Sequence, residues 1–156
     1  MTNTQGPDVT VQRSTRRGMA AVSARLPIGR VPATFRAYLD QVYAAARGGA
    51  IQVDGQNIFL YRSTGGQDGE VEAEFGVGIG APFAPIGNVH YSQLPDGEVA
   101  TATHWGDYAR LGETHAAVIE WCRANGRERT GTRWEVYGHW VDDPARVRTD
   151  VFYLLA

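Results

Sequence analysis

Short stretches of the chain alternate apolar and polar residues, the pattern typical of β-strands that bury one face. In the clearest stretch, residues 70–79, every second residue is apolar and those between are glutamate or glycine. The apolar members are Val71, Ala73, Phe75, Val77 and Ile79. The same reasoning predicts strands at residues 9–12, 19–26, 57–62, 88–94, 98–104, 133–140 and 148–155.

Two other stretches carry apolar residues three or four positions apart, which predicts helices with one buried stripe. The stripes are Val31, Phe35, Tyr38, Leu39, Val42 and Ala46 in the first helix and Leu111, His115, Val118, Ile119 and Cys122 in the second. Gly48-Gly49 and Asn125-Gly126 end them, since glycine readily terminates a helix. We interpret His115 and Cys122 as core residues.

The predicted elements occur twice in the same order, β-β-α-β-β. A shift of about 77 residues lays Gly29 on Gly106 and Gly49 on Gly126, the sign of an internal structural repeat. We place repeat one at about residues 8–79 and repeat two at about 88–156, within a single domain spanning 8–156. The polar residues 1–7 are expected to form a disordered tail.

This element order predicts an α+β fold: an eight-stranded antiparallel sheet, two helices on one face, and a central cleft on a pseudo-twofold axis. A cleft between related halves is where a ligand is expected. The turn sequence Pro95-Asp96-Gly97 further predicts a hairpin between strands 88–94 and 98–104.

Composition narrows the functional classes. The net charge of −2 provides no basic field for direct nucleic-acid binding, and the residues before the first strand are too few for a helix-turn-helix. No apolar run is long enough to span a membrane, and Met1 to Pro7 lacks the apolar segment of a signal peptide, so we expect a cytoplasmic protein. The four histidines and one cysteine form no metal-ligand pattern, and no cofactor motif is present, so neither metal nor cofactor is expected.

Four motifs in the second half identify a family. They are His104-Trp105-Gly106-Asp107-Tyr108, Ala124-Asn125-Gly126, Trp134-Glu135-Val136-Tyr137 and Arg148-Thr149-Asp150-Val151-Phe152-Tyr153-Leu154. In order and spacing they resemble the GyrI-like effector-binding family, which also forms the ligand-sensing domain of many AraC-type and MerR-type regulators. The family more often has Gly-Pro-Tyr where this chain has Trp105 to Tyr108, and the first half of the chain matches in layout only.

The resemblance implies a cleft lined by aromatic residues, with a glutamate on the strand after the second helix, here Glu135. Family members bind lipophilic, often cationic compounds. Some modulate DNA gyrase, and others hydrolyse cyclopropane-bearing genotoxins.

Glu135 and Tyr137 are two residues apart on a predicted strand, so their side chains leave the same face, together with Arg133 and His139. A carboxylate beside aromatic rings suits a bulky organic cation. The alternative is a solvent-exposed Glu135 paired with an arginine across the sheet. The candidate ligand-binding residues are Glu135, Tyr137, Trp105, Tyr108, Tyr38 and His139. Trp134 and Trp140 alternate with Glu135 and should face the other way, as core or as pocket wall.

Three functions remain open. The first is a standalone protein that binds a hydrophobic, cationic or drug-like molecule. The second is a self-protecting hydrolase of cyclopropane-bearing DNA-alkylating compounds, in which Glu135 activates water and Tyr137, Tyr108 or Asp107 shares the work. The third is a protein partner, such as a modulator of gyrase or of a regulator, for which the acidic strand Glu70, Glu72 and Glu74 would be the relevant surface.

Overall fold

The computed structural model describes residues 7–64, 69–139 and 141–156. The predicted disordered tail lies outside the described residues except for Pro7. The chain divides into two compact units: a C-terminal unit of residues 1–14 and 96–156, and a central unit of residues 15–95. Each is described separately below.

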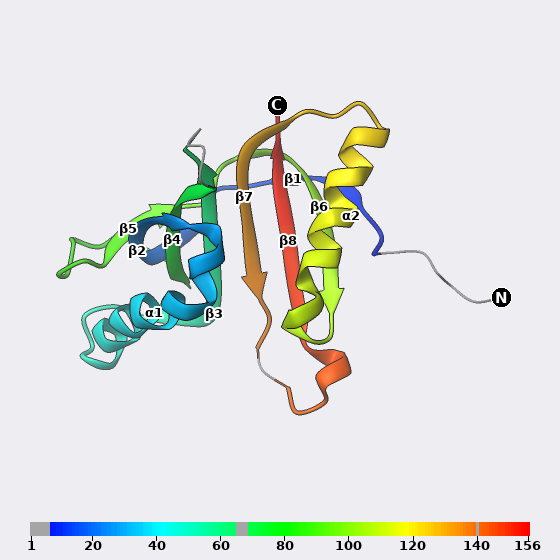
Figure 1. Ribbon diagram of the computed structural model, residues 1–156. Helices are drawn as coiled ribbons and strands as arrows, with labels where there is room; N and C mark the ends of the chain where they lie inside the picture. Colours follow the sequence, from blue (N-terminus) through cyan, green and yellow to red (C-terminus); the bar gives the residue numbers. More distant parts are fainter. Residues whose placement is uncertain (1–6, 65–68, 140) are drawn as a thin grey trace. The chain divides into compact units, whose positions relative to one another are not determined.

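The C-terminal unit contains four antiparallel strands in the order β1-β6-β8-β7. They are β1 (Thr10–Ser14), β6 (Gly97–Trp105), β8 (Arg148–Leu155) and β7 (Arg129–Tyr137). Helix α2 (Leu111–Ala124) packs on β6 and β8 (Figure 1), after a short 3-10 turn, η2 (Tyr108–Arg110); a second such turn, η3 (Pro144–Arg146), precedes β8.

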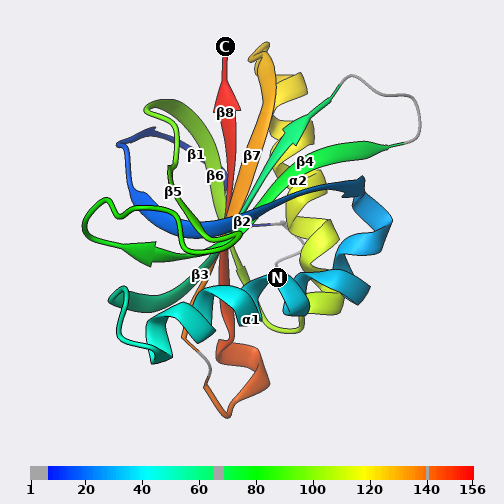
Figure 2. The same ribbon diagram turned by 90° about the vertical axis from the view of Figure 1, so that its left-hand side faces the viewer.

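The central unit repeats this layout with strands in the order β5-β2-β4-β3, again all antiparallel. They are β5 (His90–Gln93), β2 (Gly18–Pro27), β4 (Glu70–Ile79) and β3 (Val53–Ser63). Helix α1 (Val31–Arg47), shown in Figure 2, packs on β2 and β4 and follows the 3-10 turn η1 (Ile28–Arg30).

The α+β class and the antiparallel strands predicted from the repeated element order are confirmed. Both helices end where glycine predicts, with Gly49 and Gly126 at positive φ. The common helical face and the twofold cleft stay predictions. In the described residues, no helix has the length and apolar character needed to cross a membrane.

The predicted hairpin between strands 88–94 and 98–104 is wrong. β5 pairs with β2, whereas β6 has β1 along one edge and β8 along the other. Both edges of β6 are therefore occupied, and β5 cannot pair with it. The turn residues Pro95-Asp96-Gly97 connect the central unit to the C-terminal unit and do not close a hairpin.

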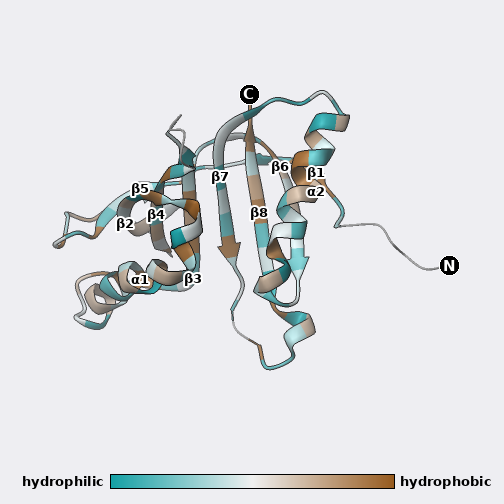
Figure 3. Ribbon diagram, in the orientation of Figure 1, coloured by the Kyte–Doolittle hydropathy of each residue, from teal (hydrophilic) through white to brown (hydrophobic). Residues whose placement is uncertain are grey.

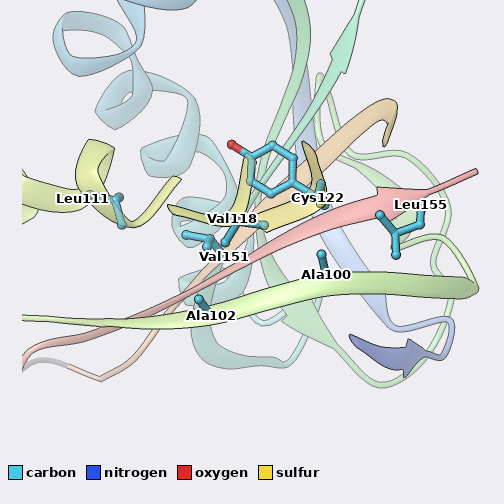
Figure 4. Packing of buried hydrophobic residues seen from close by; sticks show 8 residues of the cluster. Ala100, Ala102, Leu111, Val118, Cys122, Val151 and Leu155 are labelled. Carbon is cyan, nitrogen blue, oxygen red and sulfur yellow. The ribbon is translucent and has the colours of Figure 1, made fainter. Parts of the chain in front are cut away.

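The core of the C-terminal unit lies between α2 and the face of the sheet formed by β6 and β8. Figure 4 shows Leu111, Val118 and Cys122 of the helix stripe packed with small residues of the strands. Hydrophobic residues gather towards the C-terminal end of β8 (Figure 3), where Val151, Tyr153 and Leu155 are buried. Alternation along β8 therefore defines a helix-facing side of this sheet and an opposite side.

The acidic strand β4 is less exposed to solvent than its alternation predicted. Glu70 and Glu72 pair with Arg25, but Glu74 is only 8% exposed. Its carboxylate accepts a hydrogen bond from Arg62 at 2.6 Å and lies 3.3 Å from His90 Nε2. Burial opposes ionisation of Glu74, yet bonds from Ser92 and Arg62 outweigh it and lower its pKa.

Candidate ligand-binding site

Strand β7 directs Glu135 to the helix-facing side of the C-terminal sheet. Glu135 lies opposite Val151 in the register with β8, and Tyr137 lies opposite Thr149. Directly opposed residues share a face, so both point towards α2. Trp134 faces the other way, 1% exposed and stacked on Phe152 at 5.5 Å, as alternation predicted. Trp140 lies outside the described residues.

The carboxylate of Glu135 is buried and held at both oxygens. The residue is 7% exposed. Tyr137 donates its hydroxyl hydrogen to Oε1 at 2.7 Å, and Nε2 of His115 lies 2.6 Å from Oε2. Two donors make a buried carboxylate tolerable by replacing part of its lost hydration.

His115 continues the chain of hydrogen bonds to β8, since its Nδ1 lies 2.6 Å from the Tyr153 hydroxyl. Burial raises the pKa of Tyr153 to about 12, so this phenol keeps its proton at neutral pH. The four side chains Tyr137, Glu135, His115 and Tyr153 thus form one connected hydrogen-bond chain, which we call the Glu135 chain. It joins β7, α2 and β8.

Tyr108 lies at the solvent side of the Glu135 chain. Its ring meets that of Tyr137 edge to face, with centroids 5.6 Å apart, and the residue is 44% exposed. Partial burial raises the pKa of its hydroxyl. The arrangement is an aromatic pair at the surface with an acid buried beside it, which suits a lipophilic cation.

Asp107 has a structural role in the turn that carries Tyr108. Its carboxylate accepts from the backbone N–H of Ala109 at 2.9 Å, capping η2. The buried His104 holds the same turn, with Nε2 2.8 Å from the Asp107 carbonyl oxygen and Nδ1 2.9 Å from Thr114 Oγ1. The sequence grouped Asp107 with the acid–base candidates, but its exposed side chain makes no bond to the Glu135 chain among the described residues.

Two predicted site residues of the C-terminal unit, Trp105 and His139, lie away from the Glu135 chain. Trp105 is 57% exposed and falls on the opposite side of the sheet, in a groove of about 510 Å³ where the Arg148 guanidinium lies 5.5 Å from its ring. His139 is exposed beyond the end of β7, so strand alternation no longer aims it with Glu135. Tyr38 belongs to the central unit, where its ring stacks on Phe75 at 5.3 Å.

His115 and Tyr153 are the site residues that the sequence reasoning missed. The pattern assigned His115 to the core stripe of its helix and placed Tyr153 on the strand at residues 148–155 without a role in the site. The available signal was chemical: a histidine on a buried stripe needs a polar partner, and Glu135 was the acid predicted on the strand that follows this helix. In the described residues, no group of three or more histidine, cysteine, aspartate or glutamate side chains is arranged to hold a metal ion.

A family model described as a GyrI-like small molecule binding domain matches residues 8–155. The chain belongs to this family. The resemblance drawn from the motifs of the second half of the sequence is thereby confirmed, and this GyrI-like domain is a small-molecule-binding domain by family. Among curated proteins, a sequence search found no match.

Solved structures similar to this GyrI-like domain include the crystal structure of the EcmrR C-terminal domain, with a TM-score of 0.75, 16% identity, and coverage of 96% of this chain and 98% of that one. The structure of SAV2435 bound to tetraphenylphosphonium has a TM-score of 0.70 and 12% identity, covering 96% and 94%. A hydrolase encoded by lin2189 from Listeria innocua has a TM-score of 0.55 and 11% identity, covering 99% and 94%. At these identities the likeness shows the fold.

Proposed function

We propose that this GyrI-like domain binds a lipophilic organic cation, with Glu135 as its counter-charge and Tyr137 and Tyr108 as the aromatic surface against it. The observation that carries the proposal is the burial of the Glu135 carboxylate beside these two rings. Burial of a carboxylate costs desolvation free energy, and a bound cation offsets that cost by supplying the opposite charge.

The contacts of Glu135 leave it able to attract a cation. A carboxylate has about four lone-pair positions, and the two bonds from Tyr137 and His115 occupy two of them. Both partners can be neutral donors, so they stabilise the negative charge without cancelling it. The edge-to-face tyrosine pair adds dispersion and cation–π attraction.

The proposal predicts that Glu135→Gln weakens binding of tetraphenylphosphonium, a permanent cation and the ligand named for the related SAV2435 structure. The substitution keeps the size of the side chain and removes its charge. Loss of one charge-assisted contact costs about 1.5–3 kcal/mol, roughly one to two decades in Kd. Titration calorimetry at pH 8 measures it.

Glu120→Gln is the matched control, because Glu120 lies exposed on α2 and pairs with Arg123. It removes the same charge from the same unit and should leave Kd within about twofold. Equal affinities of the wild type and Glu135→Gln for the cation would show that Glu135 takes no part in cation binding. A neutral ligand of similar shape should bind both proteins alike.

A second candidate is hydrolysis of a strained cyclopropane conjugated to a carbonyl. The connected Glu135 chain favours it, because a carboxylate fixed by two donors is oriented to accept a proton from water. Water would add to a ring carbon while Glu135 takes its proton. The ring C–C bond would break, and its electrons would pass to the carbonyl oxygen, which is protonated by Tyr108 or Tyr137.

The same two variants separate binding from hydrolysis. If the domain is a hydrolase, the Glu135→Gln variant should still bind a cyclopropyl dienone but should not hydrolyse it, because an amide cannot accept the proton from water. Glu120→Gln should turn it over normally. Product analysis that finds only unchanged compound with the wild type would leave cation binding as the function.

A further inference from the structure

We propose that His115 is a positioning residue whose protonation state controls whether Glu135 accepts a cation. With a neutral imidazole, His115 orients an ionised Glu135 that is available to the ligand. With a protonated imidazole, His115 becomes the counter-ion of Glu135 and competes with the ligand. The inference rests on the proposed cation-binding function and adds to it a dependence on pH.

The hydrogen bonds of His115 set its form at neutral pH. A neutral imidazole has one donor and one acceptor nitrogen, while a protonated ring has two donors. Tyr153 keeps its hydroxyl proton, and among the described residues its one hydrogen-bond partner is His115 Nδ1. With Nδ1 as the acceptor of that proton, Nε2 carries the ring hydrogen and donates it to Glu135 at 2.6 Å.

The surroundings of His115 include cations as well as the acid. From β7, Glu135 and Tyr137 belong to the Glu135 chain, and Arg133 lies opposite Tyr153 in the register with β8. The Arg129 guanidinium lies 6.0 Å from the Tyr153 ring. Other titratable groups near this face include Tyr108, whose ring meets that of Tyr137, His104 on β6, bonded to Thr114, and the buried Cys122 on α2.

These groups act on a positive charge at His115 in opposite directions. Arg129 and Arg133 disfavour a further positive charge, while Glu135 favours it. In the neutral form the Glu135 chain carries one negative charge, and in the protonated form it carries none. The protonation state of His115 therefore decides what a cationic ligand meets at the site. With a neutral His115 it meets a negatively charged Glu135, and with a protonated His115 it meets a completed ion pair.

The test is the affinity for tetraphenylphosphonium between pH 8 and pH 5, measured by calorimetry on the full chain. This probe keeps its charge at every pH, so only the protein titrates. For the wild type we expect Kd to rise at least tenfold towards pH 5. For His115→Gln, whose amide nitrogen can still donate to Glu135 but cannot take up a proton, we expect the Kd measured at pH 8 to change by less than about threefold across the range.

His90→Gln is the matched control, since His90 also lies beside a buried glutamate, Glu74, but in the central unit. It should keep the pH dependence of the wild type. A wild-type Kd that does not change with pH, or an unchanged dependence in His115→Gln, would overturn the role of His115. Cation binding at pH 8 that is insensitive to Glu135→Gln would instead overturn the proposed function, so the two failures are distinguishable.

A second measurement needs no variant. Ring-nitrogen NMR of the wild type at pH 8 should show hydrogen on Nε2 of His115 and a bare Nδ1. It should show both nitrogens protonated at pH 5. Hydrogen on Nδ1 at pH 8 would contradict the proposed direction of the chain.

Discussion

The two buried glutamates of the described residues are stabilised in different ways. Glu74 is neutralised by Arg62, a permanent cation, and hydrogen-bonded by neighbours that lower its pKa. Glu135 is bonded to Tyr137 and His115, neither of which must carry charge. A carboxylate whose charge is solvated but not cancelled retains a field for a ligand, whereas a completed ion pair does not. This difference makes Glu135 the better candidate for the site.

Tyr153 forms one end of the Glu135 chain, and removal of its hydroxyl group should break the hydrogen bond to His115. Tyr153→Phe leaves Nδ1 without its donor, so we expect unfolding by urea to require about 0.5–1.5 kcal/mol less free energy. The hydroxyl pKa near 12, against an ordinary 10, also predicts that the folded state loses stability between pH 10 and 12, as the unfolded tyrosine ionises first.

Ultraviolet titration checks the second part of that prediction. One tyrosine of the wild type should ionise near pH 12, and this late step should be missing from Tyr153→Phe. A late step that persists in the variant would assign it to another residue.

At the scale of elements, Gly76 in β4 allows the neighbouring strand β2 to approach closely. A Cβ placed on Gly76 would lie 2.5 Å from the Ala20 carbonyl oxygen and 2.9 Å from Ala21 Cβ, both on β2. Backbone atoms cannot move aside as a flexible side chain can. Gly76 therefore reflects the close pairing of β4 with β2 at this position, whereas a Cβ on Gly78 would meet the side chains of Asp54 and Arg17.

Gly76→Ala should consequently destabilise the fold by about 1–3 kcal/mol, the usual cost of overpacking. Gly80→Ala is the control, because no atom lies within 4 Å of a Cβ at that position and its φ is not in the left-handed region. Thermal unfolding of the two variants compares them. A stability for Gly76→Ala equal to that of the control would mean that β2 and β4 separate at little cost.

At the scale of the whole molecule, each compact unit contains one strand from the other half of the sequence. β1 comes from repeat one but pairs with β6 in the C-terminal unit. β5 comes from repeat two but pairs with β2 in the central unit. Neither repeat holds all of its own sheet, so we propose that the whole span of residues 8–156 is the folding domain.

Removal of residues 1–14 tests this exchange of strands. It strips β1 from the edge of β6, so we expect a loss of about 2–5 kcal/mol from several broken ladder bonds. Hydrogen exchange should quicken in residues 97–101, the partners of β1. A chain lacking only residues 1–7 should be nearly unaffected, and equal protection of β6 in both chains would contradict the pairing.

Repeated patterns in the sequence were sufficient to predict the elements and their class. Alternation placed β8 at residues 148–155, its observed bounds, and glycines marked the ends of both helices. The pattern also placed Glu135 and Tyr137 on one face, where Tyr137 donates to Glu135. These features depend on local geometry, which repeats every two or 3.6 residues and is visible along the chain.

Tertiary structure alone decided which strands pair and which side chains meet. β5 pairs with β2 and not with β6, the next strand in the sequence, because β1 and β8 occupy both edges of β6. A local turn sequence carries no information about these distant partners. His115 bonds to Glu135 and to Tyr153 because a helix and two strands bring residues 20 and 38 positions apart within hydrogen-bond distance. The sequence determined what each residue offers chemically, and long-range packing determined its partners, because pairing energies depend on neighbours that sequence spacing does not specify.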